Sequence, residues 1–122
     1  MPRRKPFPAT NHARKRLESE GWTVDRCDRT IPHCFITKDL FGMFDLLAVS
    51  PGRGILGIQV TGGTSTSNFH ARVEKIKAEP RHAIWLASGG RIQVWSYEKV
   101  SDTKERALRI LEITSAPPQG AG

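Results

Sequence analysis

The chain has 122 residues, of which 38% are hydrophobic and 25% are charged, and 19 Lys and Arg against 12 Asp and Glu give a formal charge of +7. This composition excludes disordered and fibrous proteins, and the length suits one domain. No apolar run approaches the roughly 20 residues that cross a bilayer, and the start of the chain lacks the apolar core of a secretory signal. With only two cysteines there is no disulfide framework, so we expect a cytoplasmic protein without membrane association.

The positive charge is concentrated at the start of the chain. Residues 1–16 carry six basic residues and no acidic one, whereas the remainder has 13 basic and 12 acidic residues. We expect residues 1–8, which contain three prolines, to form a flexible basic arm, residues 9–113 to form one folded domain, and residues 114–122 to be a disordered tail. An excess of basic residues makes nucleic acid the expected charged partner.

The first predicted element is a helix. Thr10 or Asn11 is an acceptable N-cap, and Gly21 is a natural residue for the position after the C-cap. Residues 22–27 alternate as a strand does. Residues 31–37 are apolar but contain a proline, which favours an edge strand or an irregular crossing.

Two apolar runs in the middle of the chain predict an antiparallel hairpin. Residues 44–49 and 55–61 are separated by Ser50-Pro51-Gly52-Arg53-Gly54, a strong turn sequence. A polar loop follows, and residues 68–77 then place Phe69, Val73 and Ile76 on one side of a predicted amphipathic helix that ends before Pro80.

Three further strands are expected in the last third of the domain. Residues 83–87 (AIWLA) form a short apolar run that suits a strand buried on both faces. Residues 91–97 and 106–113 alternate, and residues 101–103 between them predict a hairpin turn. Together the elements predict an α/β fold, in which one mixed sheet is flanked by helices and the helix at 68–77 provides a right-handed crossover.

Polar residues in the predicted central hairpin are the strongest candidates for chemistry. Asp45 interrupts one apolar strand, and Gln59 and Thr61 lie at the end of the other, on the same face because their positions differ by two. A carboxylate, an amide oxygen and a hydroxyl at one strand end suit a hard cation such as Mg²⁺. The alternative is structural: the Asp caps a neighbouring segment, and the Gln satisfies backbone groups at a sheet edge.

The order of these motifs resembles the core of the PD-(D/E)XK nuclease superfamily, and most nearly the Holliday junction resolvase-like proteins of archaea and phages. The resemblance covers roughly residues 10–97. Its motifs are the Gly21-Trp22 end of the first helix, KDLFGMFDLLAV, LGIQVTGG, a helix bearing Arg and Lys, and a further apolar strand. It implies a restriction-endonuclease-like fold with an αβββαβ core.

The resemblance also implies a mechanism. In this family an Asp and a second acid hold one or two Mg²⁺ (or Mn²⁺) ions on the scissile phosphate, and a lysine orients the attacking water. Asp45 matches the first acid, Gln59 the second acid and Thr61 the lysine. The predicted catalytic residues are therefore Asp45, Gln59 and Thr61, with Asp45 and Gln59 as metal ligands.

Gln59 and Thr61 depart from the family motif, because they supply neither the second negative charge nor the positive one. Three explanations remain open. The site is a natural variant with a displaced base such as Lys38, Arg72 or Lys75, or Gln59 is an engineered replacement of a Glu, or the fold has lost cleavage and keeps DNA binding.

The expected activity is cleavage of branched DNA such as four-way junctions, with an inactive DNA-binding module as the alternative. A symmetric junction is cut twice, so a homodimer is expected. No glycine pattern for a nucleotide cofactor is present. The residues expected to bind nucleic acid are Arg3, Arg4, Lys5, Arg14, Lys15, Lys38, Arg72 and Lys75.

Overall fold

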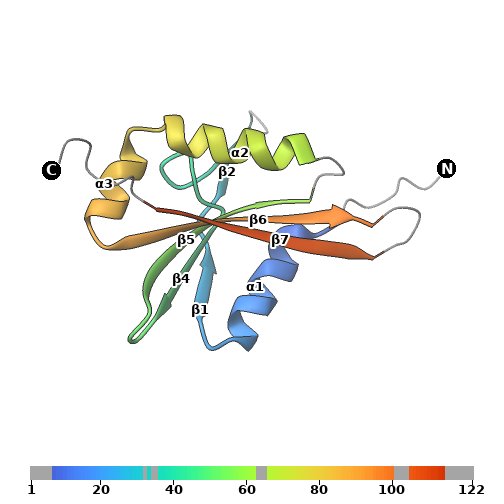
Figure 1. The fold of residues 1–122 in the computed structure, drawn as a ribbon, viewed down its shortest axis with the longest axis horizontal. Helices are drawn as coiled ribbons and strands as arrows, with labels where there is room; N and C mark the ends of the chain where they lie inside the picture. The colour runs from blue at the N-terminus through green and yellow to red at the C-terminus, as the bar shows by residue number, and fades with distance from the viewer. Residues whose placement is uncertain (1–6, 32, 34–35, 63–65, 101–104, 115–122) are drawn as a thin grey trace, which may run out of the picture.

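A five-stranded mixed sheet flanked by helices forms the body of the protein (Figure 1), and this confirms the predicted α/β fold class. The computed structural model describes residues 7–31, 33, 36–62, 66–100 and 105–114. The strands of the sheet, in spatial and in chain order, are β1 (Thr23–Arg26), β4 (Leu46–Ser50), β5 (Gly54–Thr61), β6 (Gly90–Lys99) and β7 (Arg106–Ile113). The helices are α1 (Ala9–Ser19), α2 (Thr66–Ala78) and α3 (Arg81–Ala87).

The two faces of the sheet are covered by different helices. Helix α1 packs on one face, and α2 and α3 pack on the other (Figure 1). Strands β5 and β6 are parallel and are joined through α2 and α3, as the crossover prediction required, while the other neighbours in the sheet are antiparallel. The succession α1-β1-β4-β5-α2-β6 agrees at this coarse level with a restriction-endonuclease-like core.

Helix α1 ends as its sequence predicts but begins differently. Gly21 has φ +91°, and the Trp22 N–H bonds to the Leu17 carbonyl at 3.0 Å, which is a glycine-terminated helix end with an apolar contact across it. The N-cap is Pro8, without a side-chain cap. The prediction of an N-cap at Thr10 or Asn11 is therefore wrong, because the helix takes in both residues.

The apolar run at residues 83–87 is not a strand but the greater part of α3. Pro80 stands at the N-cap, where its missing N–H costs nothing. Trp85 packs on the apolar cluster beneath α2, whereas Ile84 is 64% exposed. A short apolar run has no periodicity that separates a strand from a helix, and three of the five residues of this run are exposed.

Residues 31–37 also differ from the prediction of one edge strand or irregular crossing. Residue 31 ends strand β2 (Arg29–Ile31), and residues 36 and 37 begin strand β3 (Ile36–Lys38). These two short strands pair antiparallel in a second, two-stranded sheet. The apolar run includes residues of both strands, so its composition did not mark the boundary between them.

The remaining elements agree with their predictions. Strands β4 and β5 form the expected hairpin, α2 buries the predicted apolar stripe, and β6 pairs with β7. The predicted turn at 101–103, residues 1–6 of the predicted arm and residues 115–122 of the predicted tail lie outside the described residues. Among the described residues, no helix is long and apolar enough to cross a membrane.

Replacement of Gly57 by Ala should destabilise the fold. A Cβ atom at Gly57 would lie 2.7 Å from three ring atoms of Phe44, which is fully buried next to Asp45. We expect a loss of about 1–3 kcal/mol, typical of an overpacked core, measured by chemical denaturation. Adding Phe44→Leu should recover part of the loss, because the shorter side chain leaves room for the new methyl group. An unchanged midpoint in the single variant would contradict this packing.

Candidate functional site

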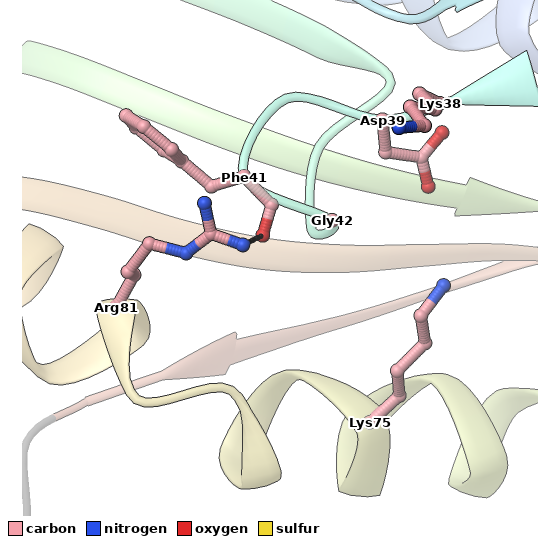
Figure 2. Close-up of a pocket in the computed structure, with 6 residues that line it drawn as sticks. All are labelled: Lys38, Asp39, Phe41, Gly42, Lys75 and Arg81. Atoms are coloured by element: carbon pink, nitrogen blue, oxygen red, sulfur yellow. Dashed lines mark hydrogen bonds between the residues drawn. The ribbon is translucent and has the colours of Figure 1, made fainter.

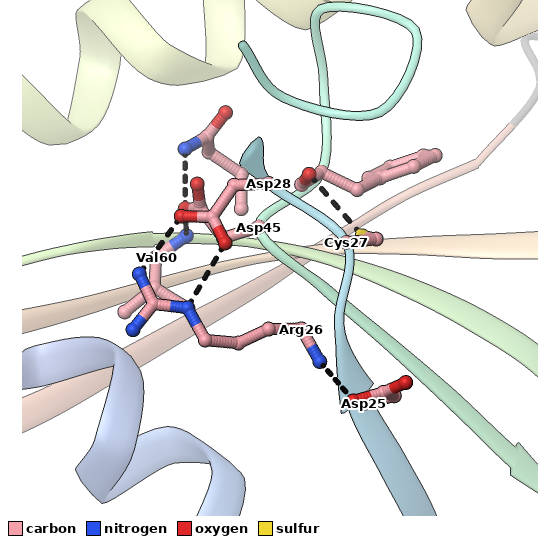
Figure 3. Close-up of polar contacts among 8 residues, drawn as sticks. Asp25, Arg26, Cys27, Asp28, Asp45 and Val60 are labelled. Carbon is pink, nitrogen blue, oxygen red and sulfur yellow. Dashed lines mark hydrogen bonds and ion pairs between the residues drawn. The ribbon is translucent and has the colours of Figure 1, made fainter. Parts of the chain in front are cut away.

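Asp45 directly precedes strand β4 and lies beside the C-terminal end of β5, beyond the residues of β5 that pair with β4. Its backbone N–H bonds to the Ile58 carbonyl at 2.9 Å, which continues the β4–β5 pairing. Its Oδ2 accepts the Val60 N–H at 2.9 Å and the Gln59 side-chain amide Nε2–H at 2.8 Å (Figure 3). The predicted proximity of Asp45 and Gln59 is thus confirmed, and Thr61 is buried two residues further along β5.

Two more carboxylates join Asp45 at this point. Oxygens of Asp28, Asp39 and Asp45 all lie within 4.8 Å of one another. Asp28 directly precedes β2 and Asp39 directly follows β3, and the Arg29–Lys38 pairing brings both to the open end of this hairpin. These three residues, the acidic triad, form a group that is able to hold a metal ion.

Sequence reasoning missed the contribution of Asp28 and Asp39. The available signal was their equal distance from the centre of the 29–38 segment, which places them opposite each other if that segment is a hairpin. Because residues 31–37 were interpreted as one edge strand or irregular crossing, the two acids were not recognised as partners.

Arg26 holds Asp28 in place. Its Nε and one terminal nitrogen each donate to a different Asp28 oxygen at 2.9 Å (Figure 3), and these hydrogen bonds are the main cause of the lowered pKa of Asp28. Such a two-point ion pair fixes the plane of the carboxylate as well as its position. Asp28 therefore stays ionised beside the other two acids.

The pKa of Asp45 is shifted in the opposite direction from that of Asp28. Burial is the main cause that raises its pKa to about 7, and neighbouring Asp39 and Asp28 act in the same direction, while the hydrogen bond from Val60 opposes them. Near neutral pH, part of the protein population therefore carries a proton on this carboxyl. A divalent cation is the kind of ligand that would displace this proton and offset the crowded negative charge.

Gln59 adds a further oxygen to the site. Its side chain is only 2% exposed, and while Nε2 donates to Asp45, Oε1 has no hydrogen-bond partner among the described residues. A buried, unsatisfied oxygen costs about 1–3 kcal/mol. The three carboxylates offer the oxygen donors that a hard cation prefers, and the Gln59 amide oxygen could join them only if the amide turned over, because Nε2 now faces Asp45.

The neighbouring thiol does not change that chemistry. Cys27 Sγ donates to the Phe44 carbonyl at 3.3 Å (Figure 3). Burial, supported by the nearby acids, raises the pKa of Cys27 to about 12. The group remains a protonated thiol at neutral pH, so it is a poor soft ligand for a metal ion.

The structure separates the basic residues that were expected to bind nucleic acid. Lys38 and Lys75 line a pocket of about 430 Å³ that also contains Asp39 of the acidic triad (Figure 2). Arg72, also on α2, does not line it. Arg14 and Lys15 lie on α1, across the sheet from α2 (Figure 1), and Arg14 Nε lies 3.9 Å from Glu18 Oε1. The predicted residues Arg3, Arg4 and Lys5 lie outside the described residues.

No protein-family model, curated protein or solved structure matches this chain. The assignment of a function therefore depends on the geometry of the acidic triad and its surroundings. The resemblance to the PD-(D/E)XK superfamily stays a hypothesis.

Asp45→Asn should stabilise the protein when divalent cations are removed with EDTA. The Asn oxygen can accept both hydrogen bonds, while the buried charge disappears. Because the folded-state pKa of Asp45 is about 7 and its ordinary value is 3.8, wild-type stability falls as pH rises from about 4 to about 7. The gain in the variant should therefore be largest above about pH 7.

The measurement is a series of thermal unfolding curves across this pH range, with an expected gain in Tm of about 5 °C on the alkaline side. Asp25→Asn is the matched control, because Asp25 is exposed and outside the triad, and an Asn oxygen can still accept the Arg26 backbone N–H. A lower Tm for Asp45→Asn than for wild type in EDTA above about pH 7 would contradict this account of the site.

Proposed function

We propose that this protein is a metal-dependent nuclease that hydrolyses phosphodiester bonds in branched DNA, and that it uses Mg²⁺ or Mn²⁺. The observation that carries the proposal is the meeting of three aspartates at the end of β5, next to the amide of Gln59, whose buried Oε1 has no hydrogen-bond partner among the described residues. Hard divalent cations prefer such oxygen donors, and nucleic acid is the expected partner of a chain with formal charge +7.

The residues fit the ion by their chemistry. Asp28, Asp39 and Asp45 would supply negative charge, and Gln59 would supply a neutral oxygen. A bound divalent cation would supply activation of a water molecule and neutralisation of charge on the phosphate. Arg26 positions Asp28 through its two hydrogen bonds, and Thr61 offers a hydroxyl where the family has a lysine.

Among the candidates for a displaced base, Lys38 and Lys75 are favoured over Arg72. Both lysines line the pocket that includes Asp39, and Arg72 does not. Figure 2 shows the Lys75 side chain rising from α2 toward the segment that bears Asp39. A cation in this place can contact the phosphate that is to be cleaved.

A homodimer forms part of the proposal, because a symmetric four-way junction needs two cuts. The second candidate function is an inactive DNA-binding module on the same fold. It is favoured by Thr61, which supplies no positive charge, and by the bond from Gln59 Nε2 that occupies one Asp45 oxygen.

The decisive experiment incubates the protein with labelled four-way junction, flap and linear duplex DNA, with Mg²⁺, with Mn²⁺ or with EDTA. We expect metal-dependent cleavage of the branched substrates. Asp45→Asn should reduce the rate by at least about 100-fold, since residues that only support metal ligands already cost about 10–100-fold. Binding of the junction should persist in the variant.

Asp25→Asn is again the control, and it should cleave at the wild-type rate. Absence of cleavage of every substrate by the wild-type protein, with binding intact, would favour the inactive module. Cleavage that is equal in EDTA and in Mg²⁺ would contradict the role of the acidic triad.

Binding should also depend on salt through the two lysines of the pocket. Each phosphate contact contributes roughly 0.7–0.9 to the slope of log affinity against log salt concentration, so Lys38→Ala with Lys75→Ala should lower the slope by roughly 1.4–1.8. The control pair, Lys77→Ala with Lys99→Ala, removes two exposed charges outside the pocket. If the two double variants show equal salt slopes, Lys38 and Lys75 do not contact the DNA.

A further inference from the structure

The pocket beside the acidic triad is large enough to hold a ligand, and most of its lining residues are charged. Its volume of about 430 Å³ lies within the roughly 300–1,000 Å³ of small-molecule pockets. Asp39 belongs both to this pocket and to the acidic triad. A molecule in the pocket would therefore lie next to the candidate metal ion.

Phe41, which lines the pocket, carries an exposed aromatic ring, and Figure 2 shows this ring on the Arg81 side, pointing away from Lys38 and Lys75. Phe41 is 41% exposed and has φ +55°, a backbone conformation that bulky residues rarely adopt. The loop is held in this shape by bonds from the Gly42 N–H to the Asp39 carbonyl at 2.9 Å and from the Phe44 N–H to the Leu40 carbonyl at 3.1 Å. The fold thus keeps a large apolar ring at the surface in an unfavourable conformation.

Neighbouring residues hold the ring in one place. The Arg81 guanidinium lies 5.4 Å from the centre of the Phe41 ring and donates to the Phe41 carbonyl at 3.0 Å (Figure 2). Trp85 meets the ring edge-on, with centroids 6.3 Å apart. Phe41 is therefore an ordered platform.

The charged groups of the pocket favour an anion. Three cations, Lys38, Lys75 and Arg81, line it with one carboxylate, Asp39. Arg81 is paired with Glu79, whereas neither lysine forms a salt bridge with any described residue. Two ammonium groups without a salt bridge to any described residue thus line the same pocket as Phe41, and cations together with an aromatic ring are the combination that binds single-stranded nucleic acid, by contact with phosphates and by stacking of bases.

We propose that this pocket binds one unpaired nucleotide adjoining the scissile phosphate, with the base stacked on Phe41 and the phosphates on Lys38 and Lys75. The proposal rests on the proposed nuclease function and deepens it. A paired base within a duplex cannot present its face to Phe41, whereas a base at a junction or in a single strand can. The pocket would thereby give the enzyme its preference for branched DNA.

The test measures binding in EDTA, so that it does not depend on cleavage. The probes are a short single-stranded oligonucleotide that carries one 2-aminopurine and the same oligonucleotide in duplex form. We expect tighter binding of the single strand and quenching of 2-aminopurine fluorescence by the wild-type protein. Phe41→Ala should weaken single-strand binding about tenfold, which corresponds to about 1.4 kcal/mol of lost stacking, and should leave duplex binding unchanged.

Phe41→Tyr keeps the ring and should retain the wild-type affinity. Ile110→Ala is the matched control, because Ile110 is 44% exposed on β7 and lies outside the pocket; it should have no effect. Absence of quenching with the wild-type protein overturns the proposal without any variant, as does an equal loss of affinity for both DNA forms in Phe41→Ala. If cleavage depends on metal but these binding tests fail, the nuclease function stands and the nucleotide pocket is rejected.

Discussion

The carboxylate of Asp45 supplies a hydrogen-bond acceptor at the end of β5, where the pairing with β4 stops. Strand β4 pairs with β5 only up to Ile58, and the carboxylate accepts the next available backbone N–H, that of Val60. The same oxygen accepts the amide of Gln59. Without this acceptor, buried donors on β5 would be left unsatisfied, so the end of the sheet and the candidate metal site depend on one group.

That structural role has an electrostatic cost. Asp45 is buried within reach of Asp28 and Asp39, and only Asp28 has a described salt-bridge partner, Arg26. In the protein alone, the repulsion among the three carboxylates is therefore only partly offset by the positive charge of Arg26. Sites that bind cations commonly show this condition, because a positive ion supplies the missing attraction, whereas a purely structural cluster would be more stable with fewer charges.

The parts of the fold that sequence predicted well are those in which one local pattern determines the outcome. The Ser50–Gly54 turn and its flanking apolar runs determine the β4–β5 hairpin, and that hairpin brings Asp45 to Gln59. Helix α3 was missed because an apolar run of five residues suits either kind of element. Asp28 and Asp39 were missed because their proximity depends on the pairing of β2 with β3, and the sequence between these two strands has no clear hairpin signal.

The acidic triad also explains why a glutamine at position 59 is compatible with a metal site. A glutamate there would add a fourth carboxylate, and its oxygens could not donate to Asp45 as Gln59 Nε2 does. The neutral amide instead donates to Asp45, while its own oxygen has no hydrogen-bond partner within the part of the chain that the structure describes. Charge that the family motif places on β5 is carried here by the ends of the β2–β3 hairpin. If the proposed metal site is correct, the departure at Gln59 redistributes the ligands and does not remove the site.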